Sequence, residues 1–222
     1  MKASRAPTGI RAVIFDMDGV LTDSEPLINE AAIAMFAEQG LQVMPEDFLP
    51  FVGTGEDRYI GGVAEKHQFG LDLPAAKKRT YEIYLELVPR KLKAFPGAAA
   101  LVTAVRQAGL RTAVASSADR IKIVANLEMI GLPVSGWDAV VTGEDIVLKK
   151  PAPDIFLAAA KSLNEVPNAC VVIEDAVNGI QAAKSAGMRC VAVAQTFSTD
   201  RLVKADLVRR TISNVSVSDL LG

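Results

Sequence analysis

The stretch Arg11-Ala-Val-Ile-Phe-Asp16-Met-Asp18-Gly-Val-Leu-Thr-Asp23-Ser-Glu25 decides the fold of this chain. Its apolar run, residues 12–15, is too short for a helix and rich in β-branched and aromatic side chains, which predicts a buried strand. Strands of this kind usually belong to parallel sheets that are covered on both faces. Residues two apart on an extended backbone point the same way, so Asp16 and Asp18 are expected to share a face.

These two carboxylates stand at the carboxyl end of the predicted strand, where open parallel sheets bind their ligands. Gly19 lets the chain leave the strand in a conformation that other residues resist. Because like charges repel at short range, at least one of the two aspartates needs a cation or a proton beside it. The alternative is an aspartate-rich turn that merely ends a strand. Three later strands end in matching chemistry, which favours a functional site.

Composition narrows the class of protein. The chain has 222 residues, half of them hydrophobic, which suits one large domain or a domain with an insertion. A formal net charge of -2 gives no electrostatic reason to expect a nucleic-acid or membrane partner, and no apolar run is long enough to span a bilayer. We therefore expect a soluble monomer. Residues 1–9 have no apolar segment like that of a secretory signal, and they are expected to form a flexible lead-in such as a trimmed precursor leaves.

The sequence has two cysteines and one histidine. Cys170 and Cys190 fall in apolar runs typical of strands, which predicts buried free thiols and a reducing compartment such as the cytoplasm. His67 lies in a polar helical stretch and is expected to be a solvated surface residue.

The residues after the first motif are predicted to be helical. Hydrophobic side chains recur at helical spacing in three segments: 24–39, 56–67 and 74–88. After the first of these segments, no strand is expected before Leu110. We therefore predict an all-helical insertion at 24–93, with a return linker at 93–97 and a core formed by 1–23 and 94–222. An insertion with both linkers beside the first strand is placed to form a cap over the carboxyl end of that strand.

From Gly97 onward predicted helices and strands alternate, which implies right-handed crossovers and a parallel sheet. The predicted strands are 110–115, 138–141, 169–173 and 189–194. The predicted helices are 98–107, 119–129, 153–163 and 177–186. The tail at 212–221 is expected to contain a weak strand and a last helical turn. The predicted fold class is α/β, a Rossmann-like parallel sheet core with an inserted all-helical cap.

Four predicted strands deliver polar groups at their carboxyl ends or in the following loops. These groups come in pairs: Asp16 and Asp18, Ser116 and Ser117, Lys149 and Lys150, and Glu174 and Asp175. Carboxylates, hydroxyls and ammonium groups that converge on one edge suit phosphoryl transfer, in which positioning and charge stabilisation dominate. Asp16 can attack phosphorus, and Asp175 with Asp16 offers the hard oxygen ligands that Mg²⁺ prefers. Lys150 adds a second cation, and Ser116 adds a donor for a phosphoryl oxygen.

This constellation resembles the haloacid dehalogenase superfamily over nearly the whole chain. The first motif of that family, DxDGxL, is similar to the segment 15–21, and the second, an apolar strand ending in serine, is similar to 114–116. The third motif is similar to 150–156, and the fourth to 171–175 with Gly179 after it. The helical insertion resembles the cap of the β-phosphoglucomutase-like subgroup, which also contains many small sugar-phosphate phosphatases.

The resemblance implies a role for each matching residue. Asp16 would be the nucleophile that forms a phosphoaspartate. Asp18 would be the general acid and then the base that activates water. Ser116 and Lys150 would bind the transferring phosphoryl group.

The resemblance also implies a Mg²⁺ site. Asp16, the backbone carbonyl of Asp18, Glu174 and Asp175 would form it. Dehalogenases of the superfamily need no metal and generally lack the second aspartate, so Asp18 argues for phosphoryl transfer.

The rest of the substrate is expected to contact Ser117 and the first cap loop, Gly53, Thr54, Gly55 and Glu56. For the loop, the alternative is a simple turn before a helix. For Ser117 the alternative is a solvated neighbour of Ser116, and the same alternative holds for the lysine at 149.

The sequence departs from the β-phosphoglucomutase-like subgroup in two places. Ile28 stands where members often have histidine, and the first cap loop lacks the arginine that holds a second phosphate, with Arg58 only nearby. Both departures count against mutase activity. The cap loop and several core segments are more similar to the phosphatase-like domain of a larger chloroplast membrane protein of plants. That similarity adds the chloroplast stroma as a candidate compartment.

The predicted function is Mg²⁺-dependent hydrolysis of a small phosphorylated metabolite, with sugar phosphates as the expected class, through an aspartyl-phosphate intermediate. One alternative is a β-phosphoglucomutase-like phosphomutase, which needs a bisphosphate activator. A second alternative is a catalytically weak regulatory or binding domain of a larger plastid protein.

Overall fold

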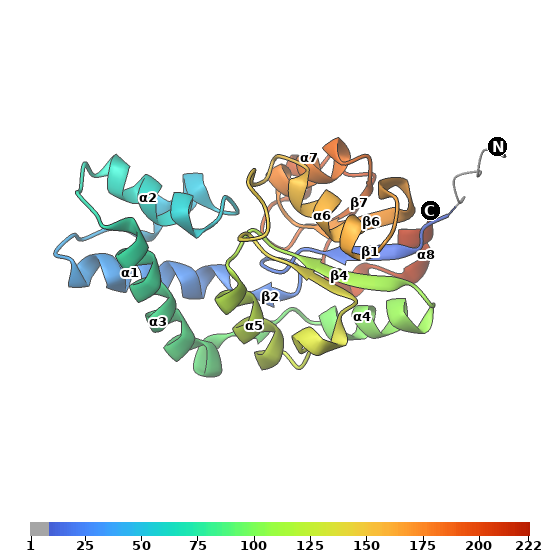
Figure 1. Cartoon of the computed structure of the whole chain (residues 1–222), viewed down its shortest axis with the longest axis horizontal. Helices are drawn as coiled ribbons and strands as arrows, with labels where there is room; N and C mark the ends of the chain where they lie inside the picture. Colours follow the sequence, from blue (N-terminus) through green and yellow to red (C-terminus); the bar gives the residue numbers. More distant parts are fainter. Residues whose placement is uncertain (1–8) are drawn as a thin grey trace.

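In the computed structural model, which describes residues 9–222, six parallel strands form one sheet in the order β5-β4-β1-β6-β7-β8 (Figure 1). The strands are β1 Ala12–Phe15, β4 Arg111–Ala115, β5 Ala139–Val141, β6 Cys170–Glu174, β7 Arg189–Val193 and β8 Leu207–Arg209. β1 lies inside the sheet, where Ala12 is in register with Arg111 on one side and with Cys170 on the other. The predicted Rossmann-like parallel sheet is confirmed. The lead-in predicted at 1–9 lies, apart from Gly9, outside the described residues.

Helices cover both faces of this sheet. They are α4 Ala98–Gln107, α5 Arg120–Met129, α6 Asp154–Ser162, α7 Val177–Ser185 and α8 Val217–Leu221. Side chains alternate along β1, so Val13 and Phe15 pack into one hydrophobic layer with α4, α5 and α8, while Ile14 packs into the other with α6 and α7. Both layers are therefore needed to bury the strand that ends in Asp16.

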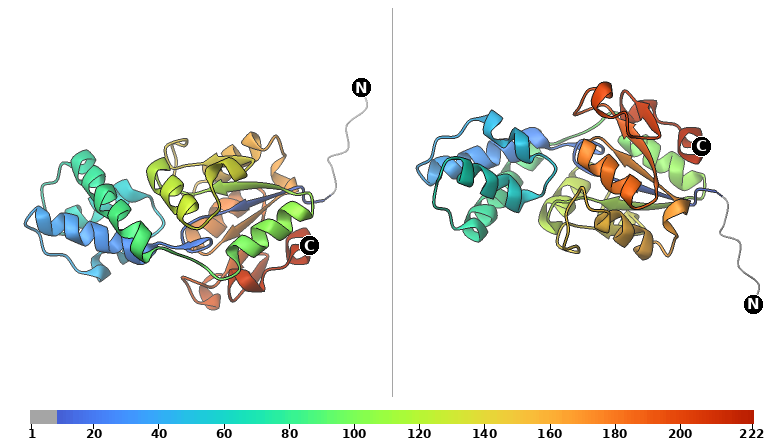
Figure 2. Two further views of the ribbon diagram at one scale, coloured as in Figure 1. Left: turned by 90° about the horizontal axis from the view of Figure 1, so that it is seen from below. Right: turned by 90° about the horizontal axis from the view of Figure 1, so that it is seen from above.

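The segment between the first two sheet strands is helical and has a hydrophobic core of its own. It contains α1 Glu25–Glu38, the 3-10 helix η1 Pro45–Phe51, α2 Glu56–Lys66 and α3 Leu73–Lys91. Phe36, Phe48 and Tyr84 are fully buried in this core, and the rings of Phe48 and Tyr59 lie 4.8 Å apart. Figure 2 shows these helices as a lobe beside the sheet, toward the carboxyl end of β1. The division into 1–23 with 94–222 and 24–93 stays a prediction.

Two short antiparallel strands, β2 Thr22–Asp23 and β3 Lys93–Ala94, join the helical lobe to the sheet. β3 contradicts the expectation that no strand precedes Leu110. Two paired residues have no periodicity that a sequence pattern could reveal, because only contact with the partner strand defines them.

The tail also differs from the prediction. The weak strand expected at 212–221 is wrong: Ile212–Asn214 is a 3-10 turn, and α8 follows it. The sixth strand is instead β8, fixed by hydrogen bonds such as that from the amide of Ala194 to the carbonyl of Arg209, 2.9 Å. The remaining 3-10 turns are η2 Val134–Gly136, η3 Pro167–Ala169 and η4 Thr199–Arg201. No helix in the described part of the chain has the length and apolar character needed to cross a bilayer.

Candidate active site

The turn after β1 brings two distant carboxylates together. Asp16 continues the sheet, since its amide donates to the carbonyl of Ile173 at 3.0 Å. Gly19 then has a φ of 79°, and a Cβ built there would lie 1.9 Å from Oδ2 of Asp175. Glycine is required at this position both for the backbone conformation and for the approach of Asp175.

Lys150 joins the ends of β1 and β6. Its Nζ donates to Oδ1 of Asp16 at 2.5 Å and to Oε1 of Glu174 at 2.6 Å, and all three side chains are buried. Burial alone would lower the pKa of the lysine, but the two adjacent carboxylates outweigh it, and the pKa of Lys150 is raised. The lysine is therefore held as a cation beside Asp16.

Three carboxylates form a compact cluster at this edge of the sheet. Asp16, Glu174 and Asp175 each offer an oxygen, and these oxygens lie within 4.8 Å of one another. Burial raises the pKa of Asp175 well above its ordinary range, and the charges of Glu174 and Asp16 raise it further. When all three carboxylates are ionised they exceed the charge of Lys150 by two, which only a nearby cation can offset, and their oxygens are hard donors. The cluster therefore fits a divalent cation such as Mg²⁺.

Glu174 uses both of its carboxylate oxygens in hydrogen bonds within the protein. Its Oε2 accepts the backbone amides of Asp175 and Ala176 at 2.8 and 2.7 Å, while Oε1 accepts Lys150. A Cβ on Gly179 would lie 1.7 Å from Oε1 of Glu174, so glycine leaves room for this carboxylate. Asp16 and Asp175 keep more of their lone pairs for a ligand.

Asp18 lies on the other side of Asp16, among hydrogen-bond donors. The hydroxyl of Ser24 donates to Oδ1 of Asp18, and the hydroxyl of Ser116 donates to Oδ2 at 3.3 Å. Nζ of Lys122, a buried side chain on α5, lies 3.1 Å from Oδ1 of Asp18 and 3.3 Å from Oε1 of Glu56. Asp18 is thus held by the β1 turn, by β4 and by α5 together.

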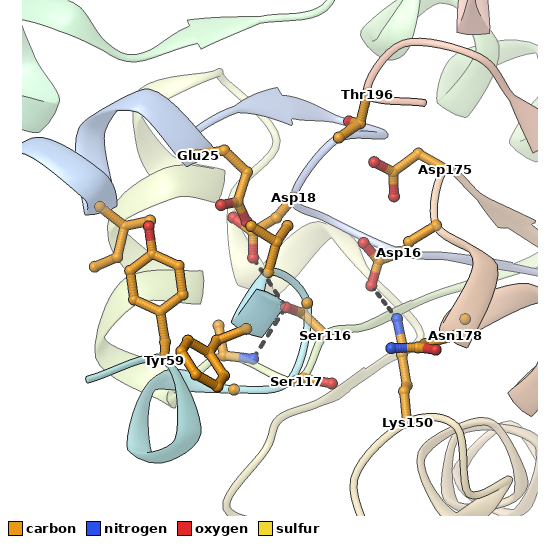
Figure 3. A pocket seen from close by; sticks show the side chains of 18 of the residues that line it. Asp16, Asp18, Glu25, Tyr59, Ser116, Ser117, Lys150, Asp175, Asn178 and Thr196 are labelled. Carbon is orange, nitrogen blue, oxygen red and sulfur yellow. Dashed lines mark hydrogen bonds and ion pairs between the residues drawn. The ribbon is translucent and has the colours of Figure 1, made fainter. Parts of the chain in front are cut away.

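These groups open into one pocket between the sheet edge and the helical lobe (Figure 3). Ten predicted site residues line it: Asp16, Asp18, Gly53, Gly55, Glu56, Ser116, Ser117, Lys150, Glu174 and Asp175. Thr54 does not, because its hydroxyl donates to the carbonyl of Phe51 at 2.7 Å within the loop. Lys149 does not either; its Nζ donates to the carbonyl of Gly143 at 2.5 Å and holds two loops together.

Two buried polar atoms in the pocket lack a hydrogen-bond partner among the described residues: Oγ of Ser117 and Oε2 of Glu56. Buried polar atoms are normally paired, so both atoms are available to a bound ligand. Burial also raises the pKa of Glu56. Ser117 follows β4 of the sheet, whereas Glu56 belongs to the first turn of α2 in the helical lobe.

Several lining residues escaped the sequence analysis: Glu25, Tyr59, Lys122, Asn178 and Thr196. Burial raises the pKa of Glu25 to about 7. Glu25 is the last residue of the stretch 11–25, and its closeness to Asp18 in the sequence could have predicted that it lines the pocket. Lys122 carried no such signal, because it lies in the first turn of a helix and reaches the pocket only through the tertiary fold. Ile28 also lines the pocket and is almost fully buried.

The remaining sequence-predicted side chains lie away from the pocket. Cys170 and Cys190 are free and buried, as predicted. His67 is exposed on the helical lobe, where its Nε2 lies 3.1 Å from a carboxylate oxygen of Asp47.

Comparison with known proteins agrees with this fold. Residues 10–187 match the haloacid dehalogenase-like hydrolase family. The chain is 31% identical to Hexitol phosphatase B of Escherichia coli (strain K12), covering 97% of this chain and 99% of that protein. It is also similar to the crystal structure of β-phosphoglucomutase from Clostridium difficile, with a TM-score of 0.83, 25% identity, and coverage of 94% of each chain.

A plant protein is more similar in sequence but much longer. Over 96% of its length the chain is 50% identical to Protein SUPPRESSOR OF QUENCHING 1, chloroplastic, of Arabidopsis thaliana. The match spans 21% of that plant protein.

The α/β fold, with a parallel sheet and a cluster of acidic groups at its carboxyl edge, is that of a hydrolase. The chain belongs to the haloacid dehalogenase-like hydrolase family. The resemblance drawn from the four motifs is confirmed, and so is the prediction of a phosphatase-type enzyme.

Proposed function

We propose that this protein is a Mg²⁺-dependent phosphatase that hydrolyses the monoester of a small phosphorylated metabolite, with a sugar phosphate as the substrate class. The observation that carries the proposal is the buried contact of Lys150 with both Asp16 and Glu174, beside Asp175. That arrangement supports Asp16 as the nucleophile, Lys150 as a fixed cation beside it, and the three carboxylates as the ligands of a metal ion.

In the first half-reaction, a carboxylate oxygen of Asp16 attacks phosphorus as the bond to the leaving oxygen breaks. Asp18 gives its proton to that leaving oxygen, so a neutral alcohol departs and a phosphoaspartate remains. Lys150 and the hydroxyl of Ser116 bind the phosphoryl oxygens, on which negative charge develops. Mg²⁺ held by Asp16, Asp175, Glu174 and the carbonyl of Asp18 would neutralise phosphoryl charge when bound.

In the second half-reaction, Asp18 takes a proton from water, and that water attacks the phosphorus of the phosphoaspartate. The bond between phosphorus and Asp16 breaks, which releases inorganic phosphate and restores both aspartates to their starting states. The helical lobe, residues 24–93, acts as a cap that limits water until the phosphoenzyme has formed. Glu56 and the loop before it contact the leaving group.

One alternative is a phosphomutase, and the likeness to a β-phosphoglucomutase structure favours it. Two observations weigh against it. Ile28 gives the pocket an apolar wall where the subgroup often has histidine, and no arginine lines the pocket among residues 9–222. Its two lysines, Lys122 and Lys150, are each already paired with two carboxylates. Among the described residues that line the pocket, no lysine or arginine is therefore free to bind a second phosphate.

The 21% coverage of the plant protein supports a further alternative, a catalytically weak regulatory or binding domain of a larger plastid protein. For the setting, we favour a monomer in a reducing compartment, either the cytoplasm or the chloroplast stroma. The buried free thiols support that choice.

A phosphate-release screen tests the proposal. Purified protein is incubated with a panel of sugar, polyol and nucleoside monophosphates, with Mg²⁺ and with a chelator, and inorganic phosphate is measured. We expect Mg²⁺-dependent release from a subset of the sugar and polyol esters. The absence of release from every ester, for a folded protein, would instead favour the binding-domain alternative.

A further inference from the structure

Lys122 occupies an unusual position for a lysine. It projects from α5 and is 2% exposed, and its Nζ lies within 3.3 Å of two carboxylates, Asp18 and Glu56. The same Nζ lies 5.7 Å from the centre of the Tyr84 ring. Burying an ammonium costs several kcal/mol unless close counter-charges compensate for the lost water, as they do here.

The two carboxylates have different duties in the proposed reaction. Asp18 is the proton donor to the leaving oxygen, whereas Glu56 begins α2 in the helical lobe and has one oxygen free in the pocket. Lys122 contacts Oδ1 of Asp18, whereas Oδ2 of the same carboxyl group accepts the hydroxyl of Ser116. The ammonium group of Lys122 therefore bridges Asp18, the proton donor, and Glu56, which lies on the side of the pocket that receives the leaving group.

A simpler reading is that Lys122 merely fastens the helical lobe to α5. Other contacts already do so. Lys77 of α3 lies 2.8 Å from Asp57 and 2.9 Å from Asp119, the residue before α5, and the hydroxyl of Tyr84 donates to Asn126 at 2.7 Å. None of these contacts involves Asp18. Lys122 differs from them because it touches the proposed acid itself.

We propose that Lys122 is a positioning residue for the reaction: it orients Asp18 toward the leaving oxygen and couples that orientation to Glu56 of the helical lobe. This inference rests on the proposed phosphatase function. When Lys122 is lost, only the hydroxyls of Ser24 and Ser116 hold Asp18, and its link to Glu56 is gone, so the carboxyl group is less firmly oriented toward the leaving oxygen. The step that suffers is protonation of the departing alcohol.

The leaving group provides the test. Glucose 6-phosphate releases an alcohol whose oxygen must be protonated as the bond breaks, whereas p-nitrophenyl phosphate releases a stable phenolate that needs no proton. We expect Lys122→Met to lower kcat for glucose 6-phosphate at least about tenfold more than for p-nitrophenyl phosphate, as loss of general acid catalysis does. Lys122→Arg, which keeps the charge, should recover part of the loss on glucose 6-phosphate.

Lys77→Met is the matched control, since it removes a lysine between the same two lobes without touching Asp18. It should lower activity on both esters by the same factor. Equal losses on both esters for Lys122→Met, or no loss, would overturn the inference and leave a structural tie. If Lys122→Met does not fold, Lys122→Gln decides, since it removes the charge but keeps a hydrogen-bond donor: a larger loss on glucose 6-phosphate than on p-nitrophenyl phosphate supports the positioning role, and equal losses reject it.

Asp16→Asn separates this inference from the function on which it rests. If the Asp16 variant still hydrolyses both esters, the proposed function fails. If it is inactive on both and Lys122→Met affects both equally, only the role of Lys122 fails.

Discussion

Asp16 and Lys150 are 134 positions apart in the chain, yet Nζ of the lysine lies 2.5 Å from Oδ1 of the aspartate in a buried ion pair. Lys150 comes from the loop before α6, and its second partner, Glu174, ends the strand that neighbours β1. Removing one member of a buried pair leaves a charge without compensation, which is strongly destabilising in general. Because Lys150 has two carboxylate partners here, one can be neutralised with a smaller effect on folding.

The first prediction concerns Asp16, and it follows from the fact that Lys150 has two carboxylate partners. Asp16→Asn should retain the fold, because the amide fills the same space and Glu174 still compensates Lys150. Turnover should fall by on the order of 10³-fold or more, because an amide cannot form the phosphoenzyme. Phosphate release and circular dichroism measure the two effects. Asp23→Asn, an exposed carboxylate of the same stretch, is the control and should stay active.

The second prediction concerns the metal. A chelator should abolish turnover and added Mg²⁺ should restore it, whereas Ca²⁺, larger and more loosely coordinated, should inhibit. Asp175→Ala should weaken Mg²⁺ binding in titration calorimetry, since it removes one of the three clustered carboxylates. Asp200→Ala, an exposed carboxylate, should bind Mg²⁺ like the parent protein. Metal-independent turnover would point to a different chemistry.

The site residues at strand ends could be predicted because the local sequence, an apolar run followed by a polar residue, determines where each of them lies. Asp16, Ser116 and Glu174 each follow an apolar run, and parallel strands place their carboxyl ends at one edge of the sheet. The pocket wall formed by the helical lobe was less predictable. Thr54 has the right position in the loop, but its hydroxyl satisfies a local carbonyl instead of facing the pocket, a competition typical of threonine.

Other features depend on contacts that no local pattern encodes. Lys122 lies in a helix, where a lysine normally indicates a solvated face, and only tertiary contacts with Asp18, Glu56 and Tyr84 bury it. β8 is three residues long and is defined by its pairing with β7. Alternation of apolar residues over so short a run gives no usable signal.

The third prediction separates phosphatase from mutase. Ile28 and the absence of arginine from the pocket lining in the described residues predict that β-glucose 1-phosphate is at most hydrolysed. The products should be glucose and inorganic phosphate, measured by enzymatic assay and by phosphorus NMR. Glucose 6-phosphate formation that is stimulated by glucose 1,6-bisphosphate would favour the mutase instead.

The fourth prediction concerns the attachment of the helical lobe. The hydroxyl of Tyr84 donates to Oδ1 of Asn126 at 2.7 Å in a buried contact, and Nδ2 of Asn126 already lacks a partner among residues 9–222. Tyr84→Phe would leave the whole amide unpaired, so the free energy of unfolding should fall by about 1–3 kcal/mol. Urea denaturation measures it. Tyr81→Phe loses only a long contact of 3.4 Å with the amide of Asp119 and should cost less.

The fifth prediction distinguishes two residues of the loop before α2. Glu56 lines the pocket with a free oxygen, whereas Thr54 bonds within the loop. Glu56→Gln should therefore change the ranking of substrates in the phosphate-release screen, because the amide replaces a hydroxyl-accepting oxygen with a donor. Thr54→Ala should lower thermal stability slightly and leave the ranking as it is. If both variants keep the parent ranking, the loop is a turn before a helix, and specificity must come from other residues of the lobe, such as Glu25 and Tyr59.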